Sequence, residues 1–188
     1  LVKPEFLNPS GSIKDRIAKY MIEAAERDGH LKPGFTIVEG STGNTGTSLA
    51  FAAAVKGYRL LVFSPQKVAN PSRAAIMLAY GCEVSKVDTD TYRSQREEVD
   101  AAVHGGRIEI LPRQLCLELE EKRDDVWWAR QFSNPYNTAA HREGTAQEIL
   151  EQTDGNLDAF VASVGTGGTL LGVAQALKAH NPRILIVG

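Results

Sequence analysis

Apolar residues recur along this chain at two different spacings. Ile13, Ile17, Tyr20 and Met21 follow the period of one helix face, and Gly29 marks the place where that helix ends. Short runs rich in β-branched and aromatic residues then alternate with further helical segments. We expect helices at 14–28, 45–56, 72–80, 92–103, 135–152 and 170–180, and strands at 35–38, 59–63, 82–87, 158–162 and 183–188.

The order strand, helix, strand, helix predicts an α/β fold with parallel, doubly wound sheets and helices on both faces. The pattern fades at 105–130, where Pro112 interrupts it. Within that stretch, 118–125 is a run of charges that we interpret as a solvated face. The expectation there is a helix followed by a strand at 126–130.

Both ends of the chain read as cut. The first residue is Leu1 rather than Met, and the strand at 183–188 has nothing after it, although a buried strand needs neighbours. We therefore expect a two-domain protein truncated at both ends. Its N-terminal domain is predicted at 1–134 and a partial C-terminal domain at 135–188.

Composition narrows the classes of function. The chain has 188 residues, of which 43% are hydrophobic, and a formal net charge of −2, as in an ordinary globular protein. Nothing is basic enough to predict nucleic-acid binding, and no apolar run approaches the roughly 20 residues that span a bilayer. Cys82 and Cys116 are too few for a disulfide framework. We expect a reducing, cytoplasmic location, with a mitochondrial or plastid one left open.

Several conspicuous side chains have ordinary interpretations. Trp127 and Trp128 are expected in the core, and Cys82 is expected to be a buried small hydrophobe. The segment 141–143 is interpreted as a helix face. The histidines lack the spacing of ligands, so no metal site is predicted; they are His30, His104, His141 and His180.

Candidate chemistry begins in the polar segment 8–16, which runs directly into the first predicted helix. Ser10 and Ser12 can cap that helix, and Lys14 falls in its first turn. A cation there opposes the helix dipole, and sequences break local rules at functional sites. A lysine amine of lowered pKa forms Schiff bases with aldehydes. The alternative is an ordinary solvated surface lysine.

Two further segments share one design, at 39–45 and 164–169. Each follows a strand, is rich in Gly, Ser and Thr, and opens a helix. Such turns direct backbone N–H groups and the positive end of a helix toward an anion. Leu170 stands where a dinucleotide fingerprint needs glycine, and no nucleoside-triphosphate loop occurs. The second turn therefore suits a compact phosphate, and the alternative is a tight turn with a capping threonine.

An amine for an aldehyde, a phosphate cradle and a second anion site together suit pyridoxal 5′-phosphate (PLP) with an amino-acid substrate. The motifs that carry this combination resemble the fold-type II PLP enzymes, in particular the cysteine synthase (O-acetylserine sulfhydrylase) and cystathionine β-synthase branch. Segment 8–16 is similar to the family's Schiff-base lysine motif, and 41–46 to its T-S-G-N-T-G loop. Segment 131–135 matches its Q-F-S-N-P motif, and 165–169 its G-T-G-G-T phosphate loop.

The resemblance implies a role for each matching residue. Lys14 would hold PLP and later move the Cα proton, and Asn44 would hydrogen-bond the cofactor's 3′-oxygen. The phosphate would lie on the glycine turn, which consists of Gly165, Thr166, Gly167, Gly168 and Thr169. The substrate carboxylate would lie on Ser41, Thr42, Gly43, Thr45 and Gln131.

The implied activity is β-replacement on O-acetylserine or serine by sulfide or a thiol, in a homodimer. Two alternatives stay open: a serine/threonine dehydratase-type lyase of the same fold, and a non-catalytic paralogue that only binds a ligand or partner. The chain also departs from the family pattern. Ser41-Thr42 reverses the family's hydroxyl order, and 89–93 lacks the usual Gly-rich segment. The family's serine facing the pyridine nitrogen would lie beyond Gly188.

Overall fold

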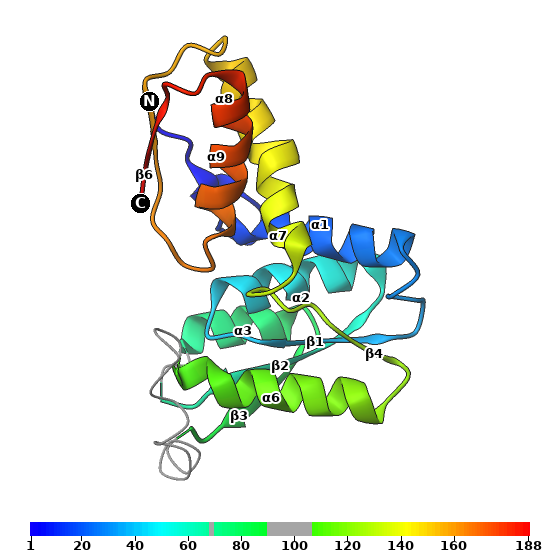
Figure 1. Cartoon of the computed structure of the whole chain (residues 1–188). Helices are drawn as coiled ribbons and strands as arrows, with labels where there is room; N and C mark the ends of the chain where they lie inside the picture. The colour runs from blue at the N-terminus through cyan, green and yellow to red at the C-terminus, as the bar shows by residue number, and fades with distance from the viewer. Residues whose placement is uncertain (68–69, 90–106) are drawn as a thin grey trace, which may run out of the picture.

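The computed structural model describes residues 1–67, 70–89 and 107–188 (Figure 1). The helix expected at 92–103 and most of 89–93 lie outside the described residues. The described strands are β1 (Thr36–Gly40), β2 (Arg59–Pro65), β3 (Glu83–Val87), β4 (Val126–Trp128), β5 (Ala159–Val161) and β6 (Leu185–Val187). The α-helices are α1 (Lys14–Arg27), α2 (Asn44–Lys56), α3 (Pro71–Ala79), α6 (Arg107–Lys122), α7 (Pro135–Ala140), α8 (Ala146–Gln152) and α9 (Gly168–His180). A 3₁₀ turn, η1 (Glu5–Leu7), and a π-helical turn, η2 (His141–Thr145), complete the described elements.

Two parallel sheets organise the chain. The first has the strand order β3-β2-β1-β4, and the second pairs β5 with β6. The chain moves outward from β1 to β3 and then returns to the other side of β1 with β4. The order therefore reverses between β1 and β4, and in open α/β sheets ligands bind at the carboxyl ends of the strands at such a point. The prediction of parallel sheets covered by helices is confirmed.

Alternating side chains build two cores, one on each face of the first sheet. Ile37 of β1, Val62 of β2 and Trp127 of β4 pack toward α1 and α2. Their neighbours Val38 and Trp128 face the opposite side, where they pack with Cys116 of α6. Strands buried on both faces need apolar residues at successive positions, which explains the near-continuous hydrophobic runs. The prediction that both tryptophans belong to the core is confirmed.

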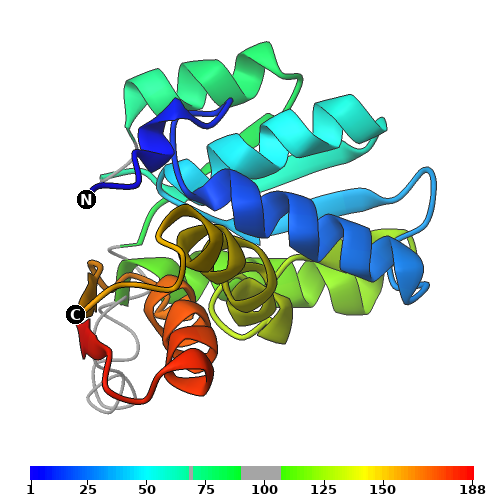
Figure 2. The ribbon, with the colours of Figure 1, turned by 90° about the horizontal axis from the view of Figure 1, so that it is seen from above.

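The second sheet has a smaller core of its own, made with α8 and α9. Ala146 and Ile149 of α8 pack there against Val173 and Leu177 of α9, and Ile184 closes the cluster. Figure 1 shows α1 lying between this smaller part and the four-stranded sheet, and Figure 2 shows the two chain ends on the same side.

Three local expectations need correction. Pro112 lies inside α6 rather than ending it: its ring packs against the backbone at Gly40, where an added Cβ would be 3.0 Å from Pro112 Cβ. Within the charge run, Glu120 does not face solvent freely, because it accepts hydrogen bonds from Trp128 N and from Arg130. In segment 141–143, His141 is fully buried, and only its two neighbours are exposed.

No helix within the described ranges is long and apolar enough to cross a membrane. Among the same residues, no group of three or more His, Cys, Asp or Glu side chains is arranged to hold a metal ion.

Candidate active site

Lys14 is the first residue of α1, as predicted. Its backbone N–H donates to Ser12 Oγ (3.2 Å), so Ser12 satisfies one N–H group of the first turn, although Ile13 occupies the N-cap position. No hydrogen bond or ion pair joins Lys14 Nζ to any other residue in the described part of the chain. Burial lowers the pKa of Lys14. A partly buried lysine without a counter-ion keeps a larger fraction of the neutral amine, which is the form that attacks a carbonyl.

The turn before Lys14 is held by polar contacts on both sides. Asp15 accepts from Ser10 N (2.7 Å) and from the Ser10 hydroxyl. Ser10 Oγ also lies 2.8 Å from Ser48 Oγ of α2, and Arg73 of α3 donates to Ser10 O (3.1 Å). These bonds fix the approach to Lys14 to two helices of the first sheet. Sequence patterns gave no sign of the partners on α2 and α3.

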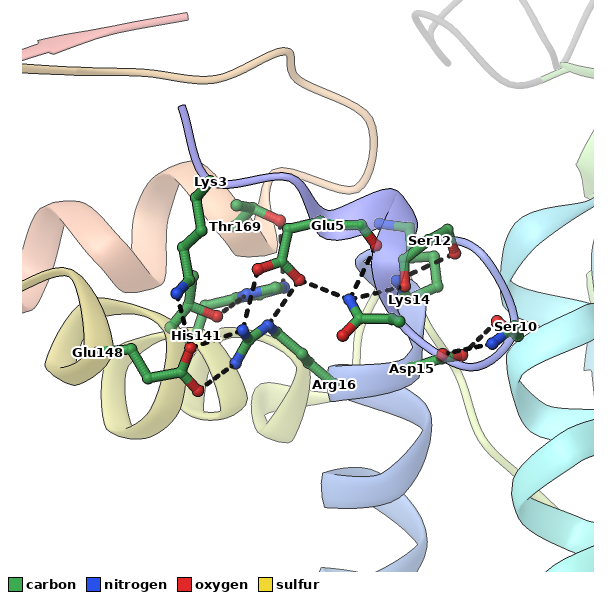
Figure 3. Close-up of polar contacts among 12 residues, drawn as sticks. Lys3, Glu5, Ser10, Ser12, Lys14, Asp15, Arg16, His141, Glu148 and Thr169 are labelled. Atoms are coloured by element: carbon green, nitrogen blue, oxygen red, sulfur yellow. Dashed lines mark hydrogen bonds and ion pairs between the residues drawn. The ribbon is translucent and has the colours of Figure 1, made fainter. Parts of the chain in front are cut away.

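Two residues further along α1, Arg16 joins the two parts of the molecule (Figure 3). Its guanidinium forms paired bonds to Glu5 (2.7 and 2.9 Å) and to Glu148 of α8 (both 2.7 Å). These bonds to Arg16 hold the pKa of Glu148 at about 2. Paired guanidinium–carboxylate contacts are geometrically specific, so Arg16 fixes α8 relative to the start of α1.

The loop that follows β1 carries the residues predicted to bind the substrate carboxylate. Ser41 Oγ accepts from the N–H groups of Gly43 (3.2 Å) and Gly46 (3.0 Å), so it stabilises the first turn of α2. Thr45 Oγ1 donates to Gln131 Oε1 (2.6 Å), and both residues are buried. The structure therefore brings Gln131, 86 residues away, onto this loop at the point where the strand order reverses.

Two other residues of the loop keep their side chains available. Thr42 is half-buried and Asn44 is exposed. Within the described residues, neither side chain forms a hydrogen bond. The predicted roles of all these residues stay predictions, and the geometry places them together at one end of the sheet.

The glycine turn at 165–169 opens α9, as the sequence indicates. Gly167 has φ +83°, in the left-handed region that favours glycine. A Cβ at Gly168 would lie 1.9 Å from Asn137 Oδ1, so no other residue fits there without displacing Asn137. Asn137 Nδ2 donates to Thr166 Oγ1 (3.0 Å) and to Gln131 O (2.7 Å). Asn137 and Gln131 thus link the glycine turn to the loop that follows β1.

His141 contacts the glycine turn and lies within electrostatic range of Lys14. Its Nε2 lies 3.1 Å from Thr169 Oγ1, and its Nδ1 lies 2.9 Å from Thr145 Oγ1. Burial, and then the charges of Lys14 and Arg16, lower the pKa of His141 to about 4. Ile13, Thr145 and Thr169 line one cavity of about 820 Å³, so the residue before Lys14 and the end of the glycine turn lie beside the same space.

His141 makes folding sensitive to pH. Its pKa in the folded state, about 4, lies below the ordinary value of 6.5, so the unfolded chain binds the proton first as pH falls. The stability that the neutral ring contributes is complete above pH 6.5 and is lost as pH falls toward 4. As pH falls to 4, the wild type should therefore lose more free energy of unfolding than His141→Gln loses. The difference between the two losses should be on the order of 3 kcal/mol.

Urea unfolding at several pH values measures this difference. His180→Gln is the matched control, because His180 is exposed. A wild-type protein and a His141 variant that lose stability in parallel between pH 7 and pH 4 would contradict a neutral His141.

The structure places three residues in this network that the sequence did not single out: Asn137, His141 and Glu39. Glu39 belongs to it because its carboxylate accepts from Gln131 N (3.0 Å). The one available signal was Glu39, a carboxylate directly after the apolar pair Ile37-Val38 in a strand that should be buried. Asn137 and His141 had no local signal, because their partners on the glycine turn, Thr166 and Thr169, lie 29 and 28 residues further along the chain.

The model of the pyridoxal-phosphate dependent enzyme family matches residues 1–188, the entire chain. The chain belongs to this family. Among curated proteins, mouse cystathionine β-synthase is 43% identical over 188 residues, which are all of this chain and 31% of that protein. Cysteine synthase of Staphylococcus aureus is 42% identical over 187 residues, covering 99% of this chain and 54% of that protein. The chain therefore spans about a third to about half of these relatives.

Solved structures of PLP-dependent enzymes share the fold. The crystal structure of an O-acetylserine-dependent cystathionine β-synthase from Helicobacter pylori matches with a TM-score of 0.82 and 34% identity. The match covers 97% of this chain and 55% of that one. The fold-type II architecture and the PLP dependence implied by the sequence motifs are thereby confirmed at the level of the family.

The residues of this chain fit PLP. The cofactor needs an amine that can be neutral and a nearby site for its phosphate. Lys14 is partly buried, and no acidic residue in the described part of the chain forms an ion pair with it. The glycine turn offers backbone N–H groups at a helix start, and Gly168 packs so closely on Asn137 that a Cβ there would lie 1.9 Å from Asn137 Oδ1. Lys14, Asn44 and the turn 165–169 would hold the cofactor.

Proposed function

We propose that the protein of which this chain is part catalyses PLP-dependent β-replacement, in which sulfide or a thiol replaces the β-substituent of O-acetylserine or serine. One observation carries the proposal. Hydrogen bonds through Thr45, Gln131, Asn137 and Thr166 join the loop after β1 to the glycine turn. His141 contacts the same glycine turn and lies within electrostatic range of Lys14. The names of the relatives, cysteine synthase and cystathionine β-synthase, support the same class of reaction.

In the proposed reaction, PLP supplies an electron sink for the bond at the substrate Cα. Lys14 would hold the cofactor aldehyde, and its neutral amine would accept the Cα proton of the substrate as a general base. A low pKa suits this second step, because the base must be neutral at working pH. The bonds of Ser10 N to Asp15 and of Lys14 N to Ser12 fix the backbone from which the Lys14 amine would serve both roles.

The other residues bind and orient. The backbone N–H groups of the turn 165–169 hold the phosphate, and Asn44 hydrogen-bonds the cofactor's 3′-oxygen. Ser41, Thr42, Gly43, Thr45 and Gln131 hold the substrate carboxylate. We further propose that the division at residue 134 separates the two domains, that the protein works as a homodimer, and that it resides in the cytoplasm.

The test is a product analysis with full-length, PLP-loaded protein. Incubation with O-acetylserine and sulfide, and with serine and homocysteine, should yield cysteine or cystathionine as the main product. Pyruvate and ammonia as main products would replace β-replacement with a lyase reaction. A protein that takes up no PLP, and therefore shows no visible absorption band, would indicate a non-catalytic paralogue.

A further inference from the structure

Glu39 is a fully buried carboxylate for which the proposed reaction has no use. It is the fourth residue of β1, and its side chain has 0% exposure. Burying a carboxylate costs free energy of desolvation unless hydrogen bonds or an ion pair compensate for it. No cation forms an ion pair with Glu39 within the described parts of the chain. An apolar side chain at this buried position would avoid the desolvation cost, so the hydrogen bonds of the carboxylate must account for its presence.

Three N–H groups converge on this carboxylate. Oε1 accepts from Gly40 N (2.8 Å) and from Trp128 Nε1 (3.3 Å). Among the described residues, Oε2 accepts from Gln131 N (3.0 Å) alone. The two oxygens are therefore unequal. Protonation favours Oε2, which has fewer donors, and it weakens the bond from Gln131 N because a neutral carboxyl oxygen is a poorer acceptor than a carboxylate oxygen.

Gln131 is the residue through which Glu39 reaches the candidate site. Its backbone N–H is held by Glu39, its Nε2 donates to Gly40 O (3.0 Å), and its Oε1 accepts from Thr45 Oγ1. Its carbonyl oxygen accepts from Asn137, which also reaches Thr166 of the glycine turn. The Glu39–Gln131 bond thus lies where the switch point of the sheet meets both anion turns.

We propose that Glu39 is a positioning residue for amino-acid binding: as a carboxylate it fixes Gln131 and, through it, the Thr45 hydroxyl, and its protonation weakens binding of the substrate carboxylate. This inference rests on the proposed function, since it assigns the loop 41–45 to that carboxylate. It extends that function by a pH dependence that the residues touching the substrate do not themselves supply.

The charged and titratable groups around Glu39 support a titration within the working range. Burial, and the nearby Glu109 of α6, raise the pKa of Glu39 to about 7 against the opposing effect of its three hydrogen bonds. Cys116 of α6 is the other titratable group facing it, and burial raises the pKa of that thiol, so it stays neutral. On the β4 side, Arg130 is engaged by Glu120.

Glu39→Gln tests the proposal, because the amide has the shape of the protonated acid. Full-length, PLP-loaded protein is titrated with L-serine, and the dissociation constant is read from the change in cofactor absorbance. We expect the variant to bind L-serine about tenfold more weakly than the wild type at pH 8.5, the effect of one lost hydrogen bond. The ratio should approach one at pH 6, where the wild-type carboxylate is itself protonated. PLP content and the borohydride-trapped lysine adduct should be unchanged.

Glu109→Gln is the matched control on the facing helix. Loss of its charge removes a repulsion that raises the pKa of Glu39. The midpoint of the L-serine pH profile should therefore move to lower pH, with unchanged affinity at pH 8.5. A merely structural role for Glu39 would not predict this movement. Equal L-serine affinities of wild type and Glu39→Gln at every pH would overturn the proposal.

Amide hydrogen exchange of the cofactor-free, full-length protein gives a readout that does not depend on activity. The peptide containing Gln131 should exchange faster in Glu39→Gln than in the wild type or in Glu109→Gln, since one acceptor of its N–H is lost. Unchanged exchange would overturn the positioning role. If the wild type takes up no PLP, the proposed function fails, and exchange at Gln131 still decides whether Glu39 fixes that residue.

Discussion

Lys14→Ala should abolish covalent attachment of PLP and lower turnover by roughly 10³-fold or more, because one residue supplies both the amine for the cofactor and the base for the substrate. The fold should persist, since Lys14 Nζ has no partner among the described residues and the side chain is not part of any of the three cores. The measurement is mass spectrometry of the full-length protein after borohydride reduction, with turnover and thermal unfolding alongside.

The matched control for this experiment is Lys19→Ala. Lys19 lies on the same helix and is exposed, so its removal should change neither the adduct nor turnover. A pyridoxyl group found on any other lysine of the wild type would refute the assignment of Lys14.

Gly168→Ala should weaken PLP binding about tenfold or more. The added methyl group would lie 1.9 Å from Asn137 Oδ1 and 2.6 Å from Asn137 Cγ, so Asn137 must move and release Thr166 and Gln131. Overpacking of this kind costs about 1–3 kcal/mol, and each 1.4 kcal/mol is a factor of ten in affinity. Equilibrium titration of the cofactor-free protein with PLP measures the loss.

Two further variants isolate the cause of that loss. Gly144→Ala places a methyl group where no atom lies within 4 Å, and it should bind PLP like the wild type. The double variant Gly168→Ala/Asn137→Ala removes the clash and should recover part of the affinity. An affinity in Gly168→Ala equal to that of the wild type would mean that the turn does not hold the phosphate.

The sequence predicted the position of those segments whose signals are local. Lys14 stands at a helix start, and the turns at 39–45 and 164–169 follow strands and open helices, as expected, while their binding roles stay predictions. The succession of strands and helices likewise predicted parallel sheets, because each element carries its own period of apolar residues.

Other parts depend on contacts between distant segments, which no local pattern encodes. Glu39 meets Gln131 only because β4 returns to the side of β1. His141 is buried because α9 packs against η2, although the next two residues, Arg142 and Glu143, are exposed. Pro112 stays within α6 because its packing against Gly40 outweighs the hydrogen bond that a proline cannot donate.

The π-helical turn η2 between α7 and α8 has a consequence for the evolution of this segment. A π-helical turn holds about one residue more than an α-helical turn, so η2 accommodates an extra residue while the helices on either side keep their register. Glu148 therefore stays beside Arg16, and Ile149 stays in the smaller core. Homologous chains that are one residue shorter within 135–152 should continue α7 into α8 as one unbroken α-helix and still keep both contacts.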